Sequence, residues 1–175
     1  CHSTVEHDIE FKVEETRIAL DKTEFCENDK ENYPFLVTPQ GTEVKIEGKG
    51  VLKTANGFSF SPSTAGGGEV EFLLNGQPSG VIASVFAAPL AKFTGRQIEK
   101  QLILTNTSVN ATSFIWLINE KEEKQDNMEP FVIELNANSP RVWAVQLTAI
   151  GNEVCGSNTS AVQTFETKTE EPQIS

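Results

Sequence analysis

Short runs of alternating apolar and polar residues make up most of this chain, and glycine, proline or asparagine separates one run from the next. Clear cases are Ile-Glu-Phe-Lys-Val at residues 9–13 and Glu-Val-Lys-Ile-Glu at residues 43–47. A period of two residues turns successive side chains to opposite faces of a β-strand, and is typical of a strand with one buried face. No long segment has the period of about 3.6 residues that marks an amphipathic helix. The pattern therefore predicts an all-β protein of antiparallel strands.

Turn signals recur about every 8–12 residues, which is the spacing found in β-sandwiches. The Asn-Gly pairs at residues 56–57 and 75–76 predict tight hairpins, because both residue types accept positive φ. Residues 62–68 predict a tight loop, and the charged residues 120–126 predict an exposed hairpin loop. Further strands are expected at residues 17–20, 34–39, 51–53, 69–74, 81–86, 91–94, 102–104, 114–118, 131–135, 142–150 and 162–165.

The spacing of the strands predicts two tandem sandwich units of about 75–85 residues each, a normal size for an immunoglobulin-like domain. The first unit is expected over residues 9–87 and the second over residues 91–167, with a short linker at residues 87–90. So short a linker should make the units meet end to end, and the interface between them decides whether they form a rigid rod. Residues 1–8 are polar and are interpreted as a tether, and residues 168–175 as a polar tail.

The chain begins at Cys1, a position that matches a mature bacterial lipoprotein, in which processing leaves an acylated cysteine at the N-terminus. Each buried methylene of an acyl chain contributes about 0.8 kcal/mol to membrane binding. Lipid attachment at Cys1 would therefore hold an otherwise soluble body at a membrane. A trimmed start or a propeptide cut is the alternative interpretation.

The other two cysteines are Cys26 and Cys155. In an exported protein they can form a disulfide between the two halves of the chain, which requires Cα atoms within about 7 Å. Small buried thiols are also common in sandwich cores, so the sequence leaves both states open. Neither cysteine lies in a Cys-x-x-Cys pair or near a histidine, which argues against a catalytic or zinc-binding role.

The expected folded body has few of the residue types on which enzymes rely for catalysis. The only histidines, His2 and His7, lie in the tether, so the body has no imidazole for general-base catalysis, a Ser-His-Asp triad or a His-bearing zinc site. The formal net charge of -11 argues against nucleic-acid binding, because an acidic surface repels phosphates. We expect no enzyme activity and no cofactor. The acidic loop that carries Glu27, Asp29 and Glu31 is a calcium candidate, and a solvated loop without a ligand is the alternative interpretation.

Aromatic residues at strand positions are interpreted as core. Trp116, Phe93 and Phe114 are expected to define the core of the second unit. Trp143 lies beside Arg141 at a strand start, and this pair is the candidate interface.

The second unit resembles the PKD family of β-sandwich modules. The matching residues are Phe93, Asn106-Thr107-Ser108, Ser113-Phe114-Ile115-Trp116 and the Val-Gln-Leu-Thr-Ala run at residues 145–149. The resemblance implies that Trp116 fills the centre of the core. The chain departs from the family at Asn119-Glu120-Lys121, where a Gly-Asp-Gly type of turn is usual, so no ligand-binding property of that turn is carried over.

The first unit resembles Ig-like modules that are common in secreted and surface proteins of Bacteroidota. The resemblance rests on Phe25-Cys26-Glu27, Gly48-x-Gly50-Val51, Phe60-x-Pro62-x-x-Ala65-Gly66 and Asn75-Gly76-Gln77. In that lineage such modules are spacers and adhesive units in lipoproteins and in gliding and secretion machinery.

Together these features predict a non-catalytic lipoprotein of the outer membrane, facing the periplasm or the exterior. Its expected role is an accessory or scaffold subunit of a secretion, gliding or outer-membrane transport complex. Its expected contacts are other envelope proteins and, through Cys1, the membrane. The alternative is a carbohydrate-binding or adhesin-type module, which would need a platform of exposed aromatic residues or a filled calcium site.

Overall fold

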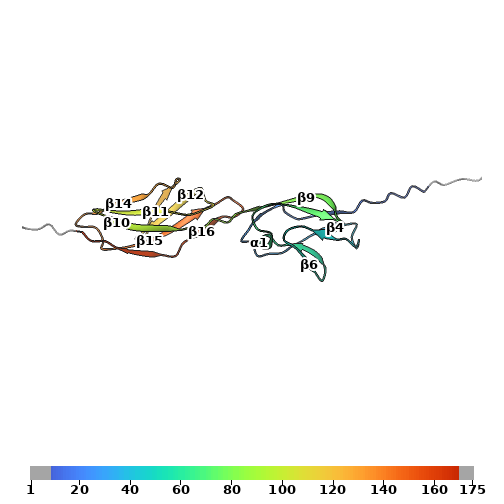
Figure 1. Cartoon of the computed structure of the whole chain (residues 1–175), viewed down its shortest axis with the longest axis horizontal. Coiled ribbons are helices and arrows are strands. Elements are labelled where there is room, and N and C mark those ends of the chain that lie inside the picture. Colours follow the sequence, from blue (N-terminus) through green and yellow to red (C-terminus); the bar gives the residue numbers. More distant parts are fainter. Residues whose placement is uncertain (1–8, 170–175) are drawn as a thin grey trace, which may run out of the picture.

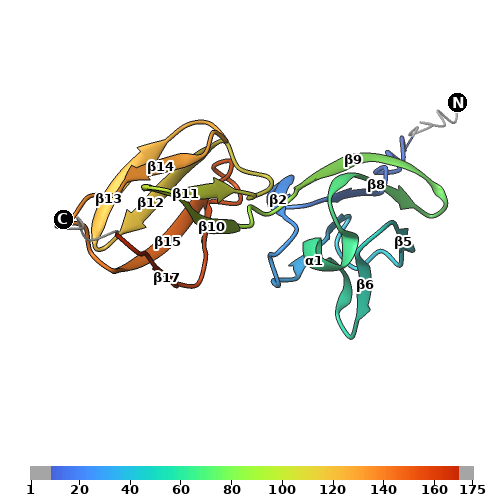
Figure 2. The same ribbon diagram turned by 60° about the vertical axis from the view of Figure 1, so that its left-hand side comes forward.

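The structure, a computed structural model, describes residues 9–169. The expected fold class is confirmed, because the described chain is all-β apart from a single four-residue helix. Two units lie end to end along the long axis, with the first described residues at one end and β17 (Gln163–Glu166) at the other (Figures 1 and 2). None of the described helical residues forms a helix long and apolar enough to cross a membrane. The predictions for Cys1, for the tether at residues 1–8 and for residues 170–175 lie outside the described residues.

The first unit contains three small sheets. A four-stranded sheet has the order β2 (Glu24–Cys26), β9 (Gln77–Phe86), β8 (Gly68–Leu74) and β5 (Ile46–Glu47). A three-stranded sheet has the order β3 (Tyr33–Pro34), β7 (Gly57–Phe60) and β6 (Val51–Thr54). A two-stranded ladder joins β1 (Arg17–Ala19) to β4 (Leu36–Thr38).

A chain of phenylalanines holds these sheets together. Phe25 meets Phe60 edge to face with ring centroids 5.0 Å apart, Phe60 meets Phe72 at 5.2 Å, and Phe72 meets Phe35 at 5.0 Å. Edge-to-face contacts place the positive edge of one ring against the negative face of the next, so they stabilise the core beyond simple burial. All four side chains are buried.

The second unit is a sandwich of two sheets. One sheet has the order β10 (Phe93–Ile98), β11 (Gln101–Asn106) and β14 (Phe131–Glu134). The other is built on β15 (Val142–Ile150), which pairs with β12 (Ser113–Ile118), β16 (Ser157–Thr159) and β17, while β13 (Lys121–Gln125) forms the edge beside β12. Trp116 lies at the centre with no exposed surface, 5.2 Å from the ring of Phe93, and its Nε1 donates to Gln125 Oε1 at 2.8 Å. Phe114 is also buried in this core.

The two units have separate hydrophobic cores. The first cluster of buried residues runs from Ile18 to Val85, and the second runs from Ala91 to Ala149 with Phe165 packed against it. The boundary between the clusters falls at the linker, residues 87–90.

Two expected strands are absent or shortened. Residues 9–13 form no strand, and residues 43–47 contribute only the two residues of β5. Alternation specifies which face a strand would bury, but a strand also needs a neighbouring edge to pair with, and residues 9–13 have none in this structure. The second segment is shortened because a turn precedes it: both the backbone N and the Oγ1 of Thr42 donate to the carbonyl of Pro39.

Three further expectations are wrong. Residues 120–126 are not a loop, because Asn119 and Glu120 make the turn, with φ of 46° and 69°, and β13 follows it. The loop expected at residues 62–68 begins with the one-turn helix α1 (Pro62–Ala65), where proline at the first position presets the helical φ. The strands are not all antiparallel, since β2 pairs with β9 in parallel.

Gly50 is a position where the fold leaves no room for a side chain. Its φ is +72°, and a Cβ there would lie 2.6 Å from the carbonyl oxygen of Ser61 and 2.7 Å from the Cβ of Ala65. Gly50→Ala is therefore expected to lower the free energy of unfolding of the first unit by more than about 2 kcal/mol, because the left-handed conformation alone costs an L-residue about 1–2 kcal/mol. Hydrogen exchange at the amides of β8 measures this unit directly.

Gly41→Ala is the matched control for Gly50→Ala. Gly41 has a similar φ of +83°, but nothing lies within 4 Å of the position its Cβ would take. Gly41→Ala should therefore lower the free energy of unfolding only by the penalty for the left-handed conformation, about 1 kcal/mol. Equal costs at the two positions would contradict the steric argument.

Candidate functional site

The linker between the units, residues 87–90, forms hydrogen bonds with both units. The backbone N of Ala88 donates to Glu27 Oε1 at 2.9 Å, and the carbonyl of Ala88 accepts from Asn110 Nδ2 at 2.9 Å. Leu90 and Val109 exchange two backbone hydrogen bonds of 3.1 Å. Because Glu27 belongs to the first unit and Asn110 and Val109 to the second, these bonds tie the linker to both units.

Pro89 and Ala91 complete this attachment. Pro89 is buried, and its ring packs so close to Gly151 that a Cβ on Gly151 would lie 3.2 Å from two of its carbons. The backbone N of Ala91 donates to Asn158 Oδ1 at 2.8 Å. A segment held at so many points has little freedom to bend, in contrast with a flexible Gly/Ser linker.

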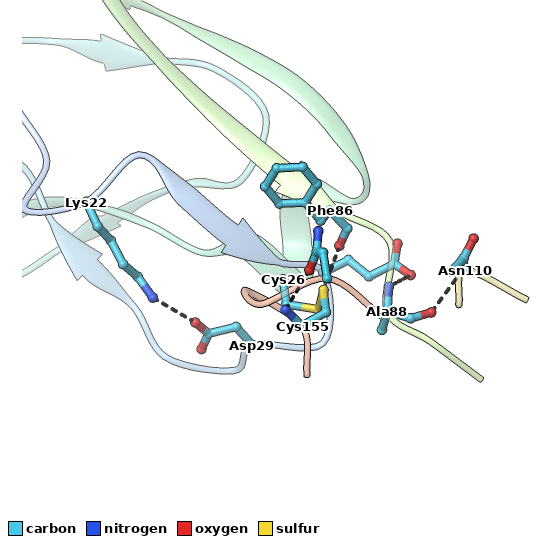
Figure 3. Close-up of a disulfide and its surroundings, with 9 residues drawn as sticks. Lys22, Cys26, Asp29, Phe86, Ala88, Asn110 and Cys155 are labelled. Carbon is cyan, nitrogen blue, oxygen red and sulfur yellow. Dashed lines mark hydrogen bonds and ion pairs between the residues drawn. A yellow bond between two sulfur atoms is a disulfide. The ribbon is translucent and has the colours of Figure 1, made fainter. Parts of the chain in front are cut away.

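A disulfide between Cys26 and Cys155 crosses the same junction (Figure 3). Cys26 ends β2 in the first unit, and Cys155 lies in the turn between β15 and β16 of the second. Their Cα atoms are 5.0 Å apart, and their sequence separation is 129. The bond lies against the end of β9, where Cys155 Sγ is 3.5 Å from the carbonyl oxygen of Phe86. Of the two states left open by the sequence, the structure has the disulfide, which links the units covalently beside the linker.

Local hydrogen bonds position each cysteine for this bond. On the first unit, the backbone N of Glu27 donates to the carbonyl of Phe86 at 2.9 Å, which continues the parallel ladder of β2 and β9. On the second unit, Asn152 Oδ1 accepts from the backbone N of Cys155, and its carbonyl accepts from the backbone N of Gly156, both at 2.8 Å. The two half-cystines are therefore presented by ordered backbone rather than by free loops.

The acidic loop after β2 is bonded internally. Tyr33 Oη donates to Asp29 Oδ2 at 2.7 Å, the backbone N of Glu31 donates to Asp29 Oδ1 at 2.9 Å, and Lys22 Nζ lies 3.5 Å from Asp29 Oδ2. Partial burial opposes the charged form of Asp29, but the hydrogen bonds from Tyr33 and Glu31 and the charge of Lys22 outweigh it and hold the pKa of Asp29 below its ordinary value. These bonds fold the loop back onto β3.

The calcium candidates do not converge on one point. Glu27 bonds to the linker, and Asp29 bonds to Tyr33 and Glu31. Across residues 9–169, no group of three or more His, Cys, Asp or Glu side chains is arranged to hold a metal ion. In the structure, the side chain of Glu27 accepts a hydrogen bond from the linker.

The two residues of the candidate interface, Trp143 and Arg141, lie in different surroundings. Trp143 is half-buried against the core of the second unit, and its Nε1 donates to Thr167 Oγ1 at 3.2 Å. It also lines an apolar hollow of about 260 Å³ together with Ile118 and Phe131. Arg141 is exposed just before β15. Whether either residue contacts a partner stays a prediction.

Sequence reasoning missed most of the junction. It marked the two cysteines, the short linker and Glu27, but it did not identify Ala88, Pro89, Asn110 or Gly151 as a contact set. The signal available was the proline within a linker of only four residues, which favours a short and restricted connection over a flexible one. No local pattern could reveal which turns of the second unit lie against that proline.

One disulfide and a hydrogen-bonded linker connect the two units at the junction. A comparison with protein-family models finds no match for this chain, and a comparison with curated proteins finds none either.

Proposed function

We propose that this protein is a non-catalytic lipoprotein of the cell envelope that acts as a rigid spacer and scaffold subunit in a membrane-associated complex. A secretion, gliding or outer-membrane transport assembly would use such a part. The observation that carries the proposal is the junction, where the disulfide and the bonded linker join the two units end to end. A spacer must resist bending, and each of these contacts opposes it.

The same bond supports the compartment that we propose. Disulfides persist in oxidising compartments such as the bacterial periplasm and the cell surface, and are rare in the cytosol. An acyl chain on Cys1 would attach the start of the chain to the outer membrane, facing the periplasm or the exterior. The resemblance of the units to PKD and Ig-like modules of Bacteroidota surface proteins supports the same location.

Partners would bind to loops and strand edges of the two units. Sandwich units leave sheet edges and loops free for other proteins. In the second unit β13 and β14 each form an edge of a sheet. The mechanism is docking at a fixed separation, and it requires no cofactor.

The adhesin alternative receives less support from the side chains. A sugar platform needs exposed aromatic rings, and Phe11 is the only aromatic residue within residues 9–169 that is exposed. A single ring on an extended segment does not make a flat platform.

Affinity purification of the full-length protein from native membranes tests the proposal. We expect recovery in the membrane fraction together with a stoichiometric envelope partner, and recovery of a Cys1→Ser variant in the soluble fraction. A glycan array probed with the same protein should stay blank. Recovery of the unaltered protein alone and only in the soluble fraction would overturn the proposal, and specific glycan binding would favour the adhesin.

A further inference from the structure

An arm of extended chain, residues 9–16, precedes β1 and runs away from the first unit (Figures 1 and 2). Its alternating apolar side chains are almost fully in solvent: Ile9 is 72% exposed, Phe11 85% and Val13 92%. In an extended chain these three side chains lie on one face, and Glu10 and Lys12 lie on the other. The arm thus has the pattern of a half-buried strand, but the structure gives it no partner.

The first unit also contains an unpaired strand edge and, near it, a cavity. The strand β5 is the last in its sheet, so within residues 9–169 no strand pairs with its outer edge. The segment that leads into β5, residues 40–44, borders a cavity of about 740 Å³, whose walls include the apolar side chains of Phe35, Val37, Val44 and Phe58. Val44 lies on the same face of its segment as the buried Ile46, two residues further on. An added strand at this edge would therefore place its own apolar face over the cavity.

The base of the arm and the start of β5 lie close together. Glu15, Thr16 and Arg17 line a surface hollow together with Leu74 and Asn75. Asn75 in turn exchanges two hydrogen bonds of 2.8 Å with the backbone of Lys45. These bonds occupy the inner side of Lys45, so the peptide groups of Val44 and Ile46 alternate toward the side on which no described strand pairs.

We propose that residues 9–13 fold back on their own unit and pair antiparallel with residues 42–46, with Phe11 opposite Val44 and inside the cavity. In this register Ile9 lies opposite Ile46. The arm becomes the fifth strand of the four-stranded sheet, and its apolar face leaves water. The structure then describes the open state of a strap that closes over the cavity.

Charge selects the direction of pairing. In the antiparallel register Glu10 lies opposite Lys45 and Lys12 lies opposite Glu43, so both cross-strand pairs join opposite charges. In a parallel register with the same central pair, Glu10 would meet Glu43 and Lys12 would meet Lys45. Opposite charges across a strand pair stabilise it and like charges destabilise it, so only the antiparallel register is favourable.

The short connection favours the same chain over a second copy. Residues 14–16 hold the arm next to its acceptor at an effective concentration on the order of millimolar. If the proposed anchoring at Cys1 holds, closing the strap also shortens the reach of the body from the membrane. The extended residues 9–16 contribute about 26 Å, at about 3.3 Å a residue.

Amide hydrogen exchange on the full chain, with Cys1→Ser so that neither an acyl chain nor a thiol is present at that position, tests the strap. Four proteins of equal net charge are compared: the unaltered body, Glu10→Lys/Lys12→Glu, Glu43→Lys/Lys45→Glu, and all four substitutions together. In the arm variant, Glu10→Lys/Lys12→Glu, the amides of Val44 and Ile46 should exchange at least about threefold faster than in the unaltered body, because both cross-strand pairs become repulsive. The fourfold variant should recover the slow exchange, and Phe11→Ser should lose it. The measurement needs neither membrane nor partner, so its outcome is independent of the proposed function.

Three results would overturn the strap. Equal exchange in all four proteins means that the arm does not pair with this edge. Faster exchange in the unaltered protein than in the arm variant means that the register is parallel. Protection that rises with protein concentration, with a dimer on size exclusion, means that a second copy supplies the arm.

Discussion

Replacing both Cys26 and Cys155 by alanine is expected to lower the free energy of unfolding by about 2–5 kcal/mol. The disulfide closes a loop with a sequence separation of 129 residues, so its removal gives the unfolded chain a large gain in conformational entropy. Both cysteines must be changed, because a single substitution leaves a reactive thiol. Urea unfolding followed by circular dichroism measures the loss.

The same variant should also change the shape of the protein in solution. With the disulfide, small-angle scattering should report one elongated arrangement of the two units. Without it, the bonds of Ala88 to Glu27 and Asn110 still hold the linker, so the distribution of overall dimensions should broaden without collapsing. Unchanged stability together with an unchanged scattering profile would contradict the mechanical role assigned to this bond.

Trp116→Ala is expected to cost the second unit about 3–5 kcal/mol, the range for large-to-small changes of a fully buried aromatic side chain. The indole has no exposed surface, packs on Phe93, and donates to Gln125, so its removal leaves a cavity and an acceptor without its donor. The two tryptophans of the chain, Trp116 and Trp143, both lie in the second unit, so the fluorescence of Trp143 still reports its unfolding.

Trp143→Ala is the matched comparison, with Trp116 as the fluorescent reporter. The ring of Trp143 is half-buried at the end of the core and borders a hollow, so fewer contacts are lost and less cavity forms. We expect a cost of about 1–2 kcal/mol. A larger cost at Trp143 than at Trp116 would mean that the centre of this core lies elsewhere.

The hairpins show where local sequence is sufficient. The Asn-Gly pair at residues 75–76 was predicted to turn the chain, and the structure confirms it: Asn75 and Gly76 have φ of 51° and 81°, and Leu74 pairs with Gln77 across the turn. The hairpin at residues 56–57 is also confirmed, but Thr54 pairs with Gly57, so Ala55 and Asn56 are its turn residues. The turn at Asn119 and Glu120 was missed because it contains no glycine.

The first unit shows where alternation misleads. Residues 9–13 and residues 43–47 have equally regular patterns, but the structure pairs only the end of the second segment. Alternation indicates which face of a strand gains free energy when it is buried. The backbone hydrogen bonds of the strand require a neighbouring strand, and the alternation does not indicate which segment that is. The strap proposed for the arm would resolve this discrepancy by pairing the two segments with each other.

The sequence by itself determined the all-β class and the two hairpins at Asn-Gly, because these follow from the preferences of residues adjacent in the chain. It also named the aromatic residues that fill the core. Only the tertiary structure decided that Cys26 meets Cys155, that Glu27 bonds to the linker, and that β2 runs parallel to β9. Each of these joins segments about 60 or more residues apart, so its energy depends on packing and bond geometry that arise only once the chain has folded, and the disulfide requires both units.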